Sequence, residues 1–208
     1  MIKNLLFDLG GVIMDIKRLN AVESLKKIGI TNADQLLGKY AQKGPFLKLE
    51  EGLISPSEFR NAIREGANVK ITDNEIDNAF CNFLTGIPAK RLKDLEQLKQ
   101  EGFNIYMLSN TNPIMWDSRI ADEFKKAGHD LNYYFDGTVT SFEAKVCKPD
   151  AAIFDFAVKK LGIVPSETLF LDDSLENVEA ARKLGFNAEV INPGEEFSAV
   201  IKRFIQNN

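Results

Sequence analysis

Short apolar runs alternate with amphipathic stretches along most of this chain. The runs cover residues 5–7, 103–108, 135–141, 168–171 and 188–191. Runs of this length suit strands that are buried on both faces of a parallel sheet. Between them, apolar residues recur at helical spacing, and glycines such as Gly102, Gly162 and Gly185 follow the last turn. This rhythm predicts an α/β fold with a Rossmann-like, doubly wound parallel sheet.

Residues 15–86 follow a different pattern, in which helical signals replace strand signals. Apolar residues recur from Ile16 to a helix end at Gly29, and the segments 55–58 and 72–75 each combine an N-cap hydroxyl with a glutamate three residues later. These features predict a small, all-helical cap inserted after the first strand. We therefore expect a core domain formed by residues 1–14 and 87–208, and a helical cap domain formed by residues 15–86.

The composition narrows the possible functions. The chain has 208 residues, 44% of them hydrophobic and 27% charged, and a formal net charge of -4, so nucleic acid is not an expected partner. Two cysteines and the lone His129 favour neither a zinc site nor a disulfide framework. The chain has no long apolar stretch and no secretion signal, so we expect a cytoplasmic protein with no membrane partner. The oligomeric state is left open.

Polar side chains gather where the predicted strands end. Because the carboxyl ends of parallel strands share one edge of a sheet, these side chains are expected to lie together. Crowded carboxylates need a cation, and hard oxygen ligands favour Mg²⁺, whereas a lysine and a serine beside them suit a phosphate group. The residues concerned are Asp8, Ser109, Asn110, Thr111, Asp172 and Asp173, with Lys148 held in front of a proline.

Four ordered motifs in this set resemble those of the haloacid dehalogenase-like (HAD) hydrolase superfamily. They are Asp8-Leu9-Gly10-Gly11-Val12, Leu108-Ser109-Asn110, Lys148-Pro149 and Leu171-Asp172-Asp173-Ser174-Leu175-Glu176-Asn177. The resemblance covers essentially the whole chain, because the helical insertion matches the small cap of subfamily I. The motifs look closest to a branch of sugar-phosphate phosphatases that resembles bacterial glucose-1-phosphate phosphatase.

The resemblance implies a Mg²⁺-dependent phosphatase that acts on a small phosphorylated metabolite, with a sugar phosphate as a plausible substrate. Asp8 would attack phosphorus to form an aspartyl-phosphate, and Lys148 would neutralise phosphate charge and keep Asp8 ionised. The implied metal ligands are Asp8, the Gly10 carbonyl and Asp173, with Asp172 binding the metal directly or orienting its waters. Substrate binding would fall to Ser109, Asn110, Thr111, Lys148 and the backbone of Leu9, while Asn177 would orient a metal ligand.

The chain departs from the family pattern at one position. Most phosphatases of the superfamily carry a second aspartate two residues after the nucleophile, as a general acid and base, and this chain has Gly10 there. Such a group commonly contributes about 10²- to 10⁴-fold in rate. We hypothesise that Asp15, or a metal-bound water, partly replaces it. The competing interpretation makes Asp15 the N-cap of the helix that begins near Ile16.

Two alternative functions stay open. A 2-haloacid dehalogenase attacks carbon with the same aspartate and also lacks the second one, but it needs no metal, so the Asp172-Asp173 pair argues against it. A phosphate-binding regulatory protein with low turnover is suggested by Gly10. EDTA-insensitive chloride release would support the first alternative, and Mg²⁺-dependent phosphate binding without hydrolysis would support the second.

Overall fold

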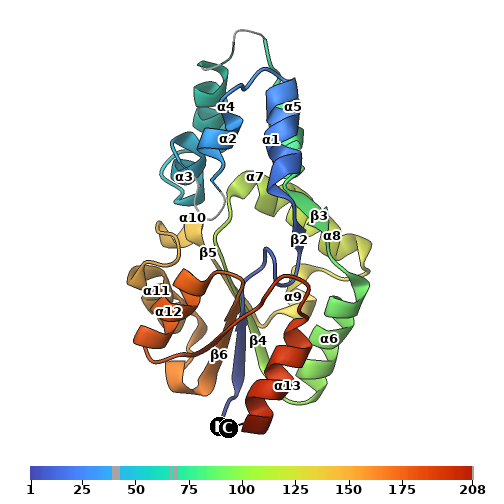
Figure 1. Ribbon diagram of the computed structural model, residues 1–208, viewed down its shortest axis with the longest axis vertical. Helices are drawn as coiled ribbons and strands as arrows, with labels where there is room; N and C mark the ends of the chain where they lie inside the picture. Colours follow the sequence, from blue (N-terminus) through green and yellow to red (C-terminus); the bar gives the residue numbers. More distant parts are fainter. Residues whose placement is uncertain (39–42, 66, 68–69, 208) are drawn as a thin grey trace.

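The computed structural model describes residues 1–38, 43–65, 67 and 70–207. One sheet of five parallel strands lies in the lower half of the molecule, with helices on both faces (Figure 1). The strand order is β5-β4-β1-β6-β7. The strands are β1 (Asn4–Phe7), β4 (Asn104–Ser109), β5 (Gly137–Thr140), β6 (Thr168–Asp172) and β7 (Asn187–Val190). The predicted doubly wound parallel sheet is confirmed.

Strand β1 occupies the centre of the sheet and is buried along its whole length. Phe7 pairs with Met107 of β4 on one side and with Leu171 of β6 on the other. The order of the strands reverses at β1, which makes the loop after it the topological switch point where α/β proteins bind ligands. The residues that follow β1, β4 and β6 therefore meet at one edge of the sheet.

Helices cover the two faces of the sheet and bury alternate residues of β1. Leu6 packs in a cluster with α11 (Ala151–Leu161) and α12 (Leu175–Lys183). Leu5 and Phe7 face the other way, toward α6 (Ala89–Gln100) and α13 (Phe197–Asn207). The shorter elements are α7 (Pro113–Met115), a π-helix (Trp116–Ile120), α8 (Ala121–Lys126), α9 (Leu131–Tyr134), α10 (Ser141–Ala144) and a 3₁₀ turn (Pro165–Glu167).

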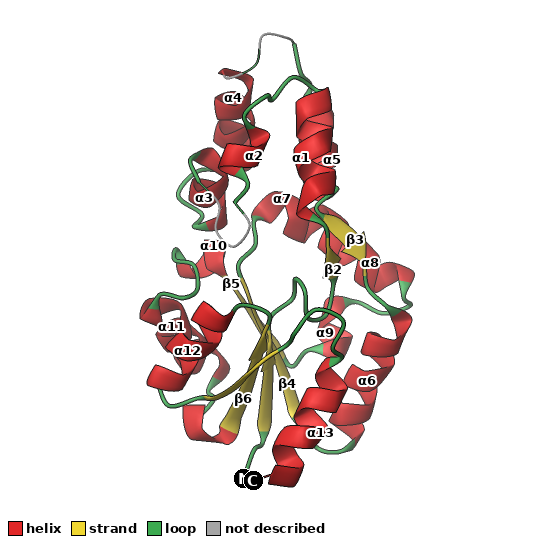
Figure 2. Ribbon diagram, viewed as in Figure 1, coloured by secondary structure: helices red, strands yellow, loops and turns green. Residues whose placement is uncertain are grey.

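The helices formed by residues 18–81 lie above the carboxyl edge of the sheet (Figure 2). The rings of Phe46, Phe59 and Phe80 contact one another in their core, with centroids 4.9 to 5.5 Å apart. Both predicted capping boxes are present, at the starts of α4 and α5. The helices are α1 (Arg18–Lys27), α2 (Ala33–Leu36), α3 (Pro45–Glu50), α4 (Pro56–Glu65) and α5 (Asp73–Cys81). The predicted domain boundaries stay a prediction, because one buried cluster runs from the sheet into these helices.

The chain enters and leaves these helices through two short strands that the sequence did not reveal. Strand β2 (Asp15–Ile16) pairs in antiparallel fashion with β3 (Leu84–Gly86). The first helix consequently begins at Arg18, and its N-cap position is Lys17 rather than Asp15. Two residues are too few to show strand alternation, so only the pairing defines them. Among the described helices, none combines the length and apolar character that crossing a bilayer requires.

Candidate active site

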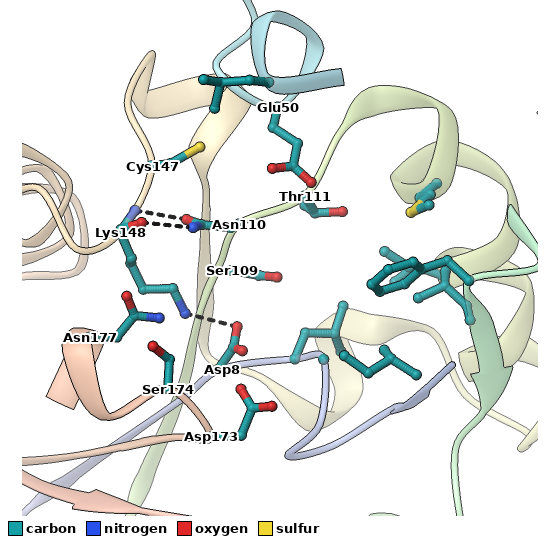
Figure 3. Close-up of a pocket in the computed structure, with 18 of the residues that line it drawn as sticks. Asp8, Glu50, Ser109, Asn110, Thr111, Cys147, Lys148, Asp173, Ser174 and Asn177 are labelled. Carbon is teal, nitrogen blue, oxygen red and sulfur yellow. Dashed lines mark hydrogen bonds and ion pairs between the residues drawn. The ribbon is translucent and has the colours of Figure 1, made fainter. Parts of the chain in front are cut away.

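The ammonium group of Lys148 lies at the centre of a buried ionic network. Its Nζ is 2.8 Å from Asp8 Oδ1 and 2.7 Å from Asp172 Oδ2, and it donates a third hydrogen bond of 2.8 Å to the carbonyl of Leu108. Burial lowers the pKa of Lys148, but the nearby Asp172 and Asp8 carboxylates more than offset this effect and raise the pKa above its ordinary value. Lys148 is therefore a fixed positive charge beside Asp8 (Figure 3).

The side chain of Asn110 positions the backbone of Lys148. Its amide nitrogen donates to the Lys148 carbonyl at 3.0 Å, and its oxygen accepts from the Lys148 N–H at 2.8 Å. This double contact links the end of β4 to the segment before α11. Both ends of this amide bind protein groups. The substrate contact predicted for Asn110 stays a prediction.

Asp172 is fully buried at the end of β6 and accepts hydrogen bonds on both oxygens. The donors are Lys148, the backbone N–H of Ser174 and the amide of Asn177. A carboxylate with this many donors is well suited to orienting Lys148. Its direct binding to a metal stays a prediction, and so does the orienting role of Asn177, for which these contacts provide a geometry.

Three carboxylates form a cluster that could hold a metal ion. Asp8, Asp172 and Asp173 each offer an oxygen within 4.8 Å of the others. Burial, followed by the charge of Asp172, raises the pKa of Asp173. Burial also raises the pKa of Asp8 to about 7, with Lys148 opposing and the two aspartates adding to the shift. Because the carboxylates are short of positive charge and all donors are oxygens, the cluster fits Mg²⁺.

Gly11 allows Asp173 to approach the loop after β1. Its φ is +78°, and a Cβ at this position would lie 2.4 Å from Asp173 Oδ2. Any other residue would collide with the carboxylate and would also occupy a backbone conformation that L-residues disfavour. The second glycine of the first motif is thus required by the geometry of the carboxylate cluster.

A cavity of about 160 Å³ opens above Asp8, between the sheet edge and the helices. Ser109 and Thr111 line it after β4, and the hydroxyl of Ser141 braces Thr111 by bonding both its N–H and its carbonyl. Of the sequence-predicted site residues, those in the lining are Asp8, Leu9, Gly10, Ser109, Asn110, Thr111, Lys148 and Asp173. Asp172 lies behind Lys148 and outside the lining.

Asp15 lies apart from this group. Its side chain is 54% exposed, its Oδ1 is 2.8 Å from Nη1 of Arg91, and it is not among the residues that line the cavity. The same Arg91 donates to the carbonyl of Ile13. The acid role hypothesised for Asp15 stays a prediction. The ion pair between Asp15 and Arg91 links β2 to α6.

Two titratable lining residues, Glu50 and Cys147, were not among the predicted site residues. Glu50 comes from α3, whose start is marked in the sequence by Gly44-Pro45, because proline is favoured at the first helical position. Cys147 precedes Lys148, and burial, together with the nearby Glu50 charge, raises the pKa of its thiol to about 12. Such a thiol is a poor nucleophile.

Comparisons with known proteins place the chain in a family. Residues 2–185 match the model of the haloacid dehalogenase-like hydrolases. D-ribitol-5-phosphate phosphatase from Bacteroides thetaiotaomicron is 39% identical over 186 residues, which is 89% of this chain and 90% of the relative.

Solved structures support the same family assignment. An HAD family enzyme from B. thetaiotaomicron, in complex with magnesium and inorganic phosphate, has a TM-score of 0.89 at 39% identity and covers 96% of this chain and 99% of its own. An HAD-like hydrolase from Porphyromonas gingivalis has a TM-score of 0.91 at 32% identity over 100% of both chains. The chain therefore belongs to the haloacid dehalogenase-like hydrolase family.

Proposed function

We propose that this protein is a Mg²⁺-dependent phosphatase that hydrolyses a small phosphomonoester through an aspartyl-phosphate intermediate. The observation that carries the proposal is the contact between Asp8 and Lys148 at the edge of the cavity, 2.8 Å long and beside the carboxylate cluster. A carboxylate that faces a cavity next to a fixed ammonium can attack phosphorus while the phosphate charge is neutralised.

In the first step, an oxygen of Asp8 attacks phosphorus and the bond between phosphorus and the ester oxygen breaks. The departing oxygen takes a proton from water, because Gly10 supplies no acid. In the second step, water hydrolyses the acyl phosphate, which releases inorganic phosphate and restores the Asp8 carboxylate. Throughout both steps, Lys148 neutralises charge and Ser109, which lines the cavity, donates to a phosphate oxygen.

The Mg²⁺ ion would be held by Asp8, Asp173 and the carbonyl of Gly10, and when bound it supplies positive charge against the phosphate dianion. Asp172 keeps Lys148 oriented through its 2.7 Å contact. The magnesium and phosphate in the related B. thetaiotaomicron structure support this assignment. Activity that persists in excess EDTA would contradict it.

The substrate class follows from cavity size and from the relatives. A cavity of about 160 Å³ suits a small metabolite better than a macromolecular ester. The 39% identical relative acts on D-ribitol-5-phosphate. We therefore place the substrate among polyol and sugar phosphates.

The test compares wild type with Asp8→Asn on a panel of polyol and sugar phosphates in MgCl₂. We expect the substitution to abolish turnover, whereas Asp117→Asn, at an exposed aspartate outside the cavity lining, leaves it unchanged. Phosphate release that survives Asp8→Asn would exclude the aspartyl-phosphate route. Chloride release from 2-haloacids that resists EDTA, without phosphatase activity, would favour the dehalogenase alternative.

A further inference from the structure

A π-helical turn interrupts the helix that follows β4. The helix runs from α7 through Trp116–Ile120 into α8, and the backbone N–H of Ala121 donates to the carbonyl of Trp116, five residues earlier. The hydroxyl of Ser118 donates to the Ile114 carbonyl at 2.5 Å, and a hydroxyl in this position competes with the backbone for that acceptor. Single π turns inside α-helices frequently occur at functional sites.

The π turn brings Met115 and Ile120 to the same side of the helix. Both side chains are buried, and both line the cavity above Asp8. In a regular α-helix, residues five positions apart point about 140° away from each other around the axis, whereas in a π turn they lie about one turn apart. Ile120 therefore reaches the cavity together with Met115 because the turn between them is wide.

The side chain of Ile120 differs in chemistry from the groups that suit a phosphate. Asp8, Ser109 and Lys148 offer charged and hydroxyl groups to the cavity. Ile120 offers only carbon atoms, so it can contact a leaving group but cannot bind the charge of a phosphate. Because the cavity measures about 160 Å³, a leaving group that enters it shares a small space with this side chain.

The surroundings of Ile120 hold it in place. The residue is 1% exposed and belongs to the large buried cluster that also contains Met115. The same helix contacts α5, where Cys81 Sγ lies 3.8 Å from Ser118 Oγ, and Figure 1 shows α7 between the helices of residues 18–81 and the sheet. Closely packed side chains do not yield to additional volume without a cost in free energy. Ile120 is therefore a fixed boundary of the cavity.

We infer that Ile120 is a specificity-determining residue that sets the upper length of the leaving group. The inference rests on the proposed phosphatase activity and states which esters the site selects, namely short linear polyol phosphates over longer ones. One additional carbon that an apolar pocket must accommodate changes kcat/KM by about 10- to 200-fold. Shortening the Ile120 side chain therefore shifts the preference toward longer esters.

A series of linear polyol phosphates with three to six carbons provides the test. The kcat/KM of each ester is measured in MgCl₂ for wild type, Ile120→Val, Ile120→Ala and the control Ile114→Val. Ile114 is a buried isoleucine of the same helix that lies outside the described cavity lining. The readout is the ratio of kcat/KM for two esters on one preparation, because an unfolded fraction lowers both values equally and cancels in the ratio.

We expect the wild-type kcat/KM to fall by at least about tenfold between one length in the series and the next. Ile120→Ala should raise the ratio of the longer to the shorter ester across this step by at least about tenfold. Ile120→Val should raise it by a smaller factor, and Ile114→Val should leave it at the wild-type value.

Other outcomes overturn the inference in distinguishable ways. A wild type that hydrolyses all lengths with similar kcat/KM has no length limit, and this result needs no variant to fold. A ratio that both Ile120 variants leave unchanged would show that Ile120 does not set the limit. An equal change in Ile114→Val would indicate loosened packing of the helix instead. No hydrolysis of any ester by wild type in MgCl₂ would overturn the proposed function itself.

Discussion

Replacement of Gly11 by alanine tests the carboxylate cluster through one added methyl group. The residue has a φ of +78°, and the new Cβ would lie 2.4 Å from Asp173 Oδ2. Ordinary contact begins at 3.4 Å, so the carboxylate must retreat by about 1 Å. Mg²⁺ binds oxygen at about 2.0–2.1 Å with little tolerance, so a displacement of this size would remove Asp173 from the ion if it is a metal ligand as proposed.

The expected losses can be separated into two parts. The left-handed backbone costs alanine about 1–2 kcal/mol, which lowers Tm by about 2–8 °C in a chain of this size. The displaced carboxylate should weaken Mg²⁺ binding by at least about tenfold, the lower end of what smaller changes around metal sites cause. Calorimetric titration with MgCl₂ measures the affinity, and thermal unfolding in EDTA measures the stability.

Gly102→Ala is a matched control for the backbone strain. Gly102 follows α6 with a φ of +93°, and a Cβ there would meet nothing within 4 Å. Its alanine variant should lose a similar amount of stability and bind Mg²⁺ as wild type does. The reasoning fails if Gly11→Ala binds Mg²⁺ as tightly as wild type, or if Gly102→Ala loses affinity to the same extent.

Three further changes test other parts of the site. Lys148→Met leaves Asp172 buried without its cation and should destabilise the protein by about 3–5 kcal/mol; a loss below about 1 kcal/mol in urea unfolding would contradict this. Because burial raises the pKa of Asp8 from 3.8 to about 7, its stabilising contribution is full below about pH 4 and is lost as pH rises through 7. The Tm of the metal-free protein should therefore fall between about pH 5 and 8, MgCl₂ should raise Tm more at pH 8 than at pH 5.5, and Asp8→Asn should flatten both trends. Asp15→Asn removes a half-exposed pair with Arg91 and tests the acid hypothesis, which predicts a loss of kcat that grows with the basicity of the leaving group. An unchanged kcat for leaving groups of differing basicity would contradict the hypothesis.

The central sheet and its chemistry could be predicted because local pattern and topology agree. Apolar runs as long as β4 and β6 can hardly be anything but buried strands, and the glycines after α6 and α11 end helices where the sequence indicates. Once the strands are parallel, Asp8 and Asp173 must meet at one edge. The predicted gathering of strand-end residues therefore depended on topology and not on any single motif.

The features that the sequence did not predict depend on contacts between segments that are distant along the chain. Strand β2 exists because Asp15 and Ile16 pair with residues about 70 positions later, which no local pattern records. Glu50 reaches the cavity because Gly52 contacts Lys145 and Phe142. The amide of Asn110 binds the backbone N–H and carbonyl of Lys148, contacts that the sequence did not predict. Sequence spacing shows which residues share an edge, whereas side-chain partners are determined by packing.

Charge at the described site indicates an order of binding. Asp8, Asp172 and Asp173 face one ammonium, that of Lys148, so full ionisation leaves an excess of two negative charges. Burial, with the two neighbouring aspartates adding and Lys148 opposing, raises the pKa of Asp8 to about 7, and the excess of negative charge would repel a phosphate dianion. A divalent cation cancels the excess, and the dianion then restores it. We therefore expect the site to accept phosphate readily only after Mg²⁺ has bound, because the cation offsets the deficit of positive charge and also favours the ionised form of Asp8.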